Sequence, residues 1–324
     1  MTSTSFGAPT ATYVKTIDVS SAVNFPTGID IYNGNLYVTT FNDRKLVKVT
    51  APLSVTPTLT TIADFSTSIT WPAGRGLISV NCNQATGDKY VAGENGSQGI
   101  LAIVNAAEAV TYSSIATTTP RYMAFDRFGT TSTVFAAPLL ASSIMRYFDT
   151  SVPPPGNPPT EITPQAAAAA APYNSNFRDG KVSGNRVYYS RNGTTPDGYA
   201  RYDAVTPNTL AGATATGIYQ TTGTNTVSAM GLGVFNDGVD EYVVVPDRSG
   251  RTVQFVNAAT NVVALTISHP AFALNAGLID ACVGTISGTK YLFVTHAGST
   301  SPTGDSVEVF QLNGFANVND WEMY

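Results

Sequence analysis

The feature that most constrains the fold of this chain is a repeated group of short apolar strands. Aromatic residues inside such strands recur at intervals of roughly 45 to 55 residues, at Tyr37, Tyr90, Phe135, Tyr188, Tyr242 and Phe293. Around the first of them, residues 28–31, 36–39, 46–49 and 58–63 form four strand patterns separated by turn residues. Groups of four strands at this spacing are typical of propeller blades. We therefore predict an all-β fold, a six-bladed β-propeller of four-stranded antiparallel blades.

The last repeat contains only three strand patterns, the third at residues 307–312. Residues 12–19 alternate apolar and polar side chains and precede the first inner strand. We expect this N-terminal strand to complete the last blade, because closure of the ring removes the free edges of an open array. The whole chain, residues 1–324, is then a single domain. A propeller of seven blades is the alternative if residues 150–175 contain further strands.

Three further features lie beside the repeats. Residues 151–175 begin with a proline-rich run that cannot form a central strand, and we interpret them as an excursion between blades. The C-terminal tail, residues 313–324, contains aromatic side chains that either pack on the propeller or dock on a neighbouring subunit. Cys82 and Cys282 fall in different predicted blades, so we expect two free thiols.

The composition favours a protein that is secreted or exposed on the cell surface. Charged residues are only 12% of the chain, so Thr, Ser, Asn and Gln must supply most of the polar surface. A net charge of −5 leaves no basic surface for a nucleic acid. No apolar run is long enough to cross a bilayer. The expected partners are therefore a protein, a carbohydrate or further copies of this chain.

One repeat resembles a known family. Residues 25–49 contain Pro26, Gly28 and Ile29, followed by the sequence Gly-Asn-Leu-Tyr-Val at residues 34–38, and this unit resembles an NHL repeat. The whole chain is similar in organisation to six-bladed propellers that include the NHL-repeat proteins and the gluconolactonase-like, regucalcin-type group. That resemblance implies the fold more than the function, because propellers of this shape serve as lactonases, lyases, scaffolds and adhesins.

In a propeller, the loops that precede the inner strands share one face with the loops between second and third strands. The resemblance implies a divalent-metal site on this face, formed by Glu94, Asn192 and Asp247, whose oxygen atoms suit Ca²⁺. The acidic residue of the family's first inner strand would fall near Pro26 or Thr27, and neither is acidic. The competing interpretation is that the three residues end strands and cap turns.

The same face carries candidate ligand-binding residues. Arg75 and Arg121 precede neighbouring inner strands at equivalent positions, with Arg178 one residue out of register, so they could hold an anion together. Alternatively, each pairs with a local acid such as Asp126 or Asp179. Two other candidates on this face are Asn42 and His296, although a lone loop histidine is usually solvated.

Two Asn-x-Ser/Thr sequences begin at Asn95 and Asn192, in predicted loops of this face. We expect both to carry glycans if the source is eukaryotic, and such glycans would obstruct an active site there.

Two functions remain open at this point. The first is a non-enzymatic extracellular binding or assembly module without a cofactor, such as a subunit of a surface structure or filament. The second is a divalent-metal-dependent lactonase or hydrolase that uses Ca²⁺.

Overall fold

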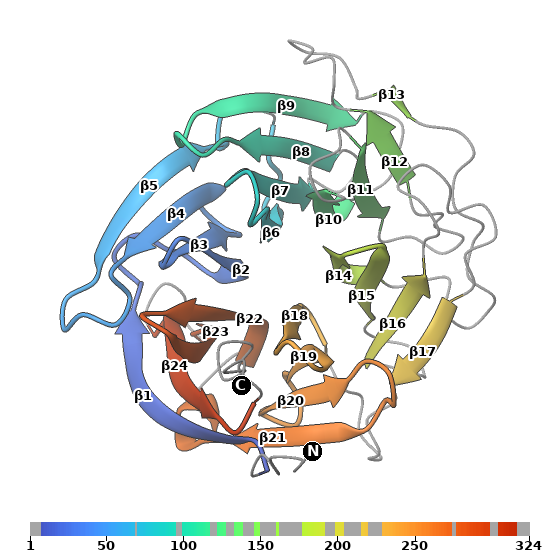
Figure 1. The fold of residues 1–324 in the computed structure, drawn as a ribbon. Coiled ribbons are helices and arrows are strands. Elements are labelled where there is room, and N and C mark those ends of the chain that lie inside the picture. The colour runs from blue at the N-terminus through green and yellow to red at the C-terminus, as the bar shows by residue number, and fades with distance from the viewer. Residues whose placement is uncertain are drawn as a thin grey trace.

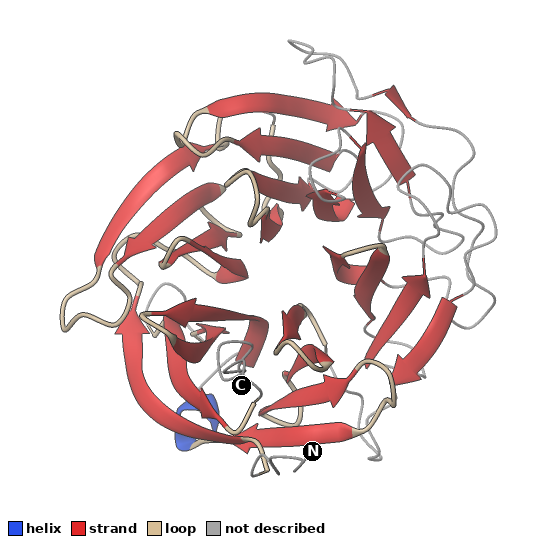
Figure 2. Ribbon diagram, in the orientation of Figure 1, coloured by secondary structure: helices blue, strands red, loops and turns tan. Residues whose placement is uncertain are grey.

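A computed structural model describes residues 8–68, 70–94, 99–116, 122–127, 133–138, 146–149, 160–161, 177–191, 198–203, 215–219, 229–273, 277–298 and 304–315. Their strands form four-stranded antiparallel sheets arranged as a ring around a central axis (Figure 1). The only helix among these residues is a single 3-10 turn, η1 (Pro270–Ala273), and strands dominate the ring (Figure 2). The predicted all-β propeller of four-stranded antiparallel blades is confirmed.

Within each sheet, chain order runs from the axis outward, except where β1 is added last. The first two sheets consist of β2 (Pro26–Tyr32), β3 (Asn35–Thr40), β4 (Lys45–Thr50) and β5 (Thr58–Asp64), then β6 (Gly76–Cys82), β7 (Lys89–Glu94), β8 (Gly99–Val104) and β9 (Val110–Ala116). The next two consist of β10 (Tyr122–Arg127), β11 (Thr133–Pro138), β12 (Arg146–Asp149) and β13 (Thr160–Glu161), then β14 (Phe177–Ser183), β15 (Arg186–Arg191), β16 (Gly198–Asp203) and β17 (Ala215–Tyr219). The last two consist of β18 (Gly233–Asn236), β19 (Glu241–Asp247), β20 (Thr252–Asn257) and β21 (Val263–Ser268), then β22 (Gly277–Ile286), β23 (Thr289–Ala297), β24 (Ser306–Asn313) and β1 (Thr10–Asp18).

The number of blades depends on what is counted. The hydrogen-bonded strands form six four-stranded sheets, whereas the blade count of the propeller is five, one fewer than expected. The sheet of β10 to β13 is the least regular, since the ladder between β12 and β13 has only two residue pairs. This sheet is therefore the one on which the difference between five and six blades depends.

Strand β1 closes the ring. It pairs antiparallel with β24, from Thr10 opposite Asn313 to Asp18 opposite Ser306. The alternation seen in the sequence places Ile17, 2% exposed, in a buried cluster with Val307 and Val309. The pairing expected for residues 12–19 is therefore present, although the strand begins at Thr10 and ends at Asp18.

Neighbouring sheets pack closely at the axis. A Cβ atom added at Gly28 on β2 would lie 2.6 Å from the backbone of Ser79 on β6, which no side chain tolerates. The glycine of the NHL-like motif is thus required for the contact between two inner strands.

Part of the C-terminal tail can be placed. Phe315 is 7% exposed and its ring lies 5.2 Å from the ring of Tyr242 and 5.3 Å from that of Phe235. The tail therefore begins by packing on its own propeller. Residues 316–324 lie outside the described residues, as does the excursion at 151–175 apart from β13.

Cys82 and Cys282 are both buried and free, as expected. Within the described part of the chain, no helix is long and apolar enough to cross a membrane.

Candidate functional site

The inner strands have backbone groups that the sheets do not satisfy. Strands β2, β6, β10, β14, β18 and β22 each form the edge of a sheet. Buried N–H groups on such an edge need acceptors, because an unpaired buried amide is costly. Aspartate side chains from neighbouring inner strands supply them.

Four such bonds join consecutive sheets around the ring. Asp30 accepts from the amide of Cys82 at 2.7 Å, and Asp126 accepts from that of Val182 at 2.7 Å. Asp179 accepts from the amide of Leu232 at 3.3 Å, and Asp280 accepts from that of Ile29 at 2.8 Å. The buried acids thus bind the ring together at the axis.

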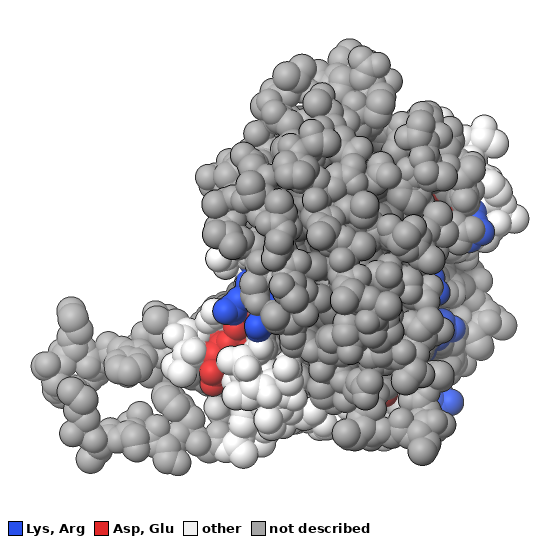
Figure 3. Space-filling view, turned by 90° about the vertical axis from the view of Figure 1, so that its right-hand side faces the viewer, with Lys and Arg blue, Asp and Glu red and all other residues white. Residues whose placement is uncertain are grey.

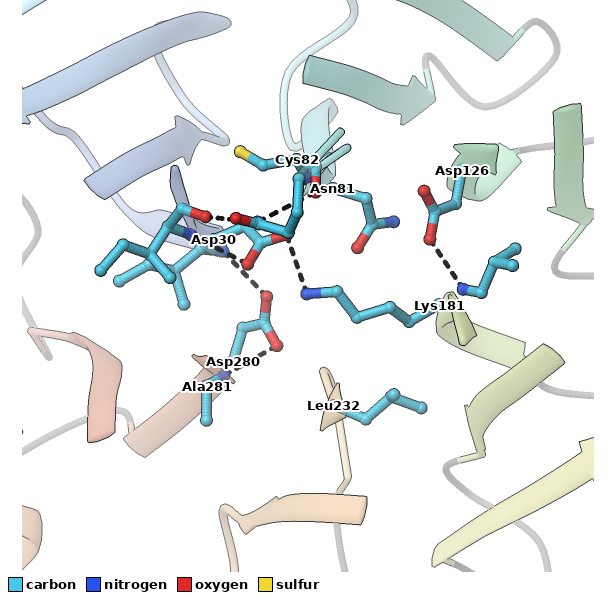
Figure 4. Close-up of polar contacts among 12 residues, drawn as sticks. Asp30, Asn81, Cys82, Asp126, Lys181, Leu232, Asp280 and Ala281 are labelled. Carbon is cyan, nitrogen blue, oxygen red and sulfur yellow. Dashed lines mark hydrogen bonds and ion pairs between the residues drawn. The ribbon is translucent and has the colours of Figure 1, made fainter. Parts of the chain in front are cut away.

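An ion pair crosses the axis. Lys181 on β14 extends toward Asp30 on β2, with Asp126 and Asp280 to either side (Figure 4), and its Nζ lies 2.9 Å from Asp30 Oδ2. Burial is the largest single influence on the pKa of Lys181 and lowers it, but Asp30, Cys282 and Asp280 together outweigh it and raise the lysine pKa. Lys181 is therefore charged at neutral pH.

Three further carboxyl groups have raised pKa values. Burial raises the pKa of Asp126 to about 7, although backbone amides of Val182 and Arg127 partly offset the rise. Burial also raises the pKa of Asp280 and of Asp179, and for Asp179 the charge on Asp280 adds to the rise. These carboxyl groups can therefore hold protons near neutral pH.

Two hollows lie at opposite ends of the inner strands. The turn-side cavity, about 730 Å³, is lined by residues at the ends of the inner strands and in the turns that follow them, among them Asp30, Asn83, Asp126, Lys181, Phe235 and Thr285. The strand-start pocket, about 200 Å³, is lined by residues at or near the beginnings of the inner strands, among them Phe25, Asp179, Met230, Arg248 and Asp280. The larger hollow is thus on the face opposite the one that carries the sequence candidates.

Two of the predicted site residues neutralise each other. Arg75, a candidate for anion binding, forms an ion pair of 3.0 Å with Glu94, a candidate metal ligand. The alternative of local pairing thus holds for Arg75, with Glu94 as the partner. The third loop candidate, Asn42, donates a hydrogen bond of 2.8 Å to Asn24.

The remaining described candidates lie apart from that pair. Asp247 is buried, and its Oδ1 accepts from the amide of Gly250 at 2.8 Å, which is the turn-capping role of the competing interpretation. His296 is only 2% exposed on β23, not solvated, and its Nδ1 lies 3.5 Å from the Ser306 hydroxyl. Arg178 is half-buried on β14.

Three candidates, Arg121, Asn95 and Asn192, lie outside the described residues. Among the residues that are described, no three His, Cys, Asp or Glu side chains gather to hold a metal ion.

Figure 3 shows one face of the molecule, on which acidic and basic atoms of described residues lie side by side at the left of the view.

The sequence reasoning missed the axial residues, although the pattern contains them. Three of them lie directly opposite an aromatic anchor in the ladder between first and second strands: Asp30 opposite Tyr37, Asp126 opposite Phe135 and Lys181 opposite Tyr188. Asp179 instead lies opposite Ser190, and Asp280 falls at a shift of register. The anchors that revealed the repeat therefore mark only part of the axial polar set.

Comparison with known proteins supports the fold and gives no family. No family model matches the chain, and no curated protein matches it. Solved structures that match include the PQQ-bound aldose sugar dehydrogenase of Streptomyces coelicolor, with a TM-score of 0.61 and 12% identity over 94% of this chain and 98% of that one. Another is a chain of the mitotic checkpoint complex, with a TM-score of 0.52 and 11% identity over 94% of this chain and 87% of that one.

At such identities the likeness concerns the fold alone, and it defines this protein as a β-propeller. The comparisons assign it neither to the NHL-repeat proteins nor to the gluconolactonase-like group.

Proposed function

We propose that this protein is an extracellular β-propeller that binds a small hydroxylated ligand of the carbohydrate class in the turn-side cavity. The observation that carries the proposal is the cavity itself, which at about 730 Å³ is within the size range of small-molecule sites. The low share of charged residues, 12%, supports an extracellular location.

The chemistry of the cavity suits hydroxyl groups, which donate and accept hydrogen bonds at once. Lys181 offers a donor, Asp126 offers acceptors, and Asn83 offers an amide, while Phe235 provides an apolar wall. The matching aldose sugar dehydrogenase acts on sugars by its name, which adds weight to this ligand class.

We include a ring of six blades in the proposal. Its support is the set of six four-stranded sheets, the last of which is completed by β1. A crystal structure that shows whether the β10 to β13 sheet forms a separate blade would decide between five blades and six.

The direct test is calorimetric titration with a panel of mono- and disaccharides, comparing Thr285→Trp with the unmodified protein. Thr285 is exposed and lines the cavity, so an indole there fills the space without disturbing the core. Thr266→Trp, a change at another exposed threonine, on the outer strand β21, is the matched control. We expect binding to be lost only in Thr285→Trp, and equal binding in all three proteins would refute this location.

A second candidate function is enzymatic. Asp126 lines the cavity, and burial raises its pKa to about 7. Its carboxyl group can therefore give up or accept a proton near neutral pH, as a general acid or base does. The similarity to a dehydrogenase structure leans the same way. Turnover of a bound sugar or lactone that Asp126→Asn abolishes without loss of binding would favour this function over simple binding.

The metal-dependent form of that enzyme needs Glu94, Asn192 and Asp247. Because Glu94 already pairs with Arg75, a divalent ion there would compete with a guanidinium group. Elemental analysis combined with unfolding in EDTA tests it: stoichiometric Ca²⁺ and a lowered midpoint would support the metal, by linkage.

Secretion and glycosylation complete the proposal. Mass spectrometry of the native protein from a eukaryotic source would show glycans at Asn95 and Asn192, and unmodified peptides would count against them.

A further inference from the structure

The strand-start pocket contains a buried carboxyl group with an unused acceptor. Asp179 on β14 is 4% exposed, and its Oδ2 accepts from the amide of Leu232 at 3.3 Å. The backbone amide of the next residue, Gly180, also acts on this carboxyl group. Asp179 Oδ1 nevertheless has no hydrogen bond of ordinary geometry among the described residues, although it is buried. A carboxylate oxygen in this state is costly and favours a donor from outside the chain.

The neighbouring acid differs in this respect. Both oxygens of Asp280 on β22 are used, since Oδ2 accepts from Ile29 at 2.8 Å and Oδ1 from Ala281 at 2.7 Å. Gly231 makes room for this carboxyl group, because a Cβ atom there would lie 2.2 Å from Asp280 Oδ1. The pocket is therefore lined by two carboxyl groups that differ in their hydrogen bonds. Both oxygens of Asp280 accept a hydrogen bond, whereas Oδ1 of Asp179 accepts none of ordinary geometry from the described residues.

The rest of the pocket is largely apolar. Its walls come from Phe25, Phe41, Ile78, Met230 and Ile279. The Phe25 and Phe41 rings lie 5.8 Å apart, near the start of β2 and after the end of β3. A ligand that fits must carry a hydrogen-bond donor at one end and an apolar body at the other.

We propose that the strand-start pocket binds a primary ammonium group carried on an apolar body, with Asp179 Oδ1 accepting one of its hydrogen bonds. An ammonium group supplies up to three donors and a positive charge beside two acids. A neutral alcohol would supply one donor and no charge. The site is separate from the turn-side cavity, so the two proposals stand or fall independently.

Binding also releases a proton. Without a ligand, burial raises the pKa of both Asp179 and Asp280, and the charge on Asp280 adds to the rise for Asp179, so these carboxyl groups hold protons near neutral pH. The other charged groups near them are Lys181 and Asp30, which pair with each other, and Arg248 at the pocket wall. An arriving ammonium ion favours the carboxylate form of Asp179, so a carboxyl proton passes to the buffer and the total charge is conserved.

The test is calorimetric titration with 2-phenylethylammonium and with 2-phenylethanol, in two buffers of different ionisation enthalpy at pH 6.5. We expect the ammonium to bind at least tenfold more tightly than the alcohol, with release of protons to the buffer. Equal affinity for both probes, or no binding of the ammonium, would overturn the proposal.

Variants locate the site. Asp179→Asn keeps an oxygen for the Leu232 amide and should weaken ammonium binding at least tenfold, whereas unchanged binding would place the ligand elsewhere. Asp64→Asn makes the same charge change at an exposed position on β5 and should bind as the unmodified protein does.

If Asp179→Asn does not fold, Met230→Trp fills the pocket and must abolish binding. Thr285→Trp should leave ammonium binding intact while removing the carbohydrate.

Discussion

The buried aspartates at the axis are alike in type and differ in how their charge is balanced. Asp30 is paired with Lys181 and also accepts two backbone amides. Asp179 has a longer bond from the amide of Leu232, a contribution from the amide of Gly180 and the charge of a second acid, Asp280, acting on it. The same substitution to asparagine should therefore have opposite effects at the two positions.

At position 179 we expect asparagine to stabilise the protein. It removes the repulsion from Asp280 and keeps an acceptor for Leu232, a gain on the order of 1 kcal/mol. The gain should be larger at pH 8 than at pH 5, because Asp179 is protonated at low pH and then repels nothing. Thermal unfolding of both proteins at both pH values checks this, and a lower midpoint for Asp179→Asn at pH 8 would contradict it.

At position 30 we expect asparagine to destabilise the protein by about 3 kcal/mol, since it leaves the buried Lys181 without its closest counter-charge. The double change Asp30→Asn with Lys181→Met should recover part of that loss. Urea unfolding of the single and double variants measures both effects. A single variant as stable as the unmodified protein would show that the pair does not hold the axis together.

At the scale of elements, the strand repeat was predictable, whereas the contacts between residues across the axis were not. Alternation and turn residues locate strands such as β5, predicted at 58–63 and found at Thr58–Asp64. They place an outer strand less well where apolar residues are few, as for β1, predicted at 12–19 and found at Thr10–Asp18. Outer strands contact few core residues, so their bounds depend on pairing more than on pattern.

The site escaped sequence reasoning for a different reason. The sequence analysis chose polar residues in loops, such as Asn42 and Asp247. Asn42 donates a hydrogen bond to Asn24 in the neighbouring loop, and Asp247 accepts one from Gly250 in its own turn. Whether Asp30 meets Lys181 depends on the diameter of the ring and on residues about half the ring apart, and no local pattern encodes either.

Deleting residues 1–20 removes β1 together with Ile17 and Val19, both buried. Each of these side chains contributes roughly 1.5–3 kcal/mol by burial, and β24 is left with a free edge. We expect a large fall in the free energy of unfolding and a tendency to aggregate, measured by urea unfolding and gel filtration.

Deletion of residues 1–9 keeps β1 and should change neither property. A synthetic peptide of residues 8–20 should restore part of the stability of the longer deletion by adding back the strand. If both deletions behaved alike, β1 would not be needed for closure.

For the whole molecule, the buried acids predict how stability depends on pH. Asp126, Asp179 and Asp280 have higher pKa values in the folded protein than the ordinary value of 3.8. The folded state therefore binds more protons between pH 4 and about 7, so stability falls as the pH rises through this range, by about 1.4 kcal/mol per unit of pKa difference for each group.

Calorimetric midpoints at pH 5, 6, 7 and 8 and constant ionic strength test this expectation. They should decrease steadily, and the decrease should be smaller in Asp179→Asn. Midpoints that stay level or increase with pH would show that these carboxyl groups are ionised throughout.

The pairing of β1 with β24 sets an order of events during synthesis. The ribosome produces β1 first and β24 almost last, so the first strand must wait for nearly the whole chain before its partner exists. Earlier sheets can form as the chain emerges, while β1 stays unpaired, with its buried face uncovered. A nascent chain of this protein is therefore most in need of protection, such as that of a chaperone, at its oldest end until translation is nearly finished.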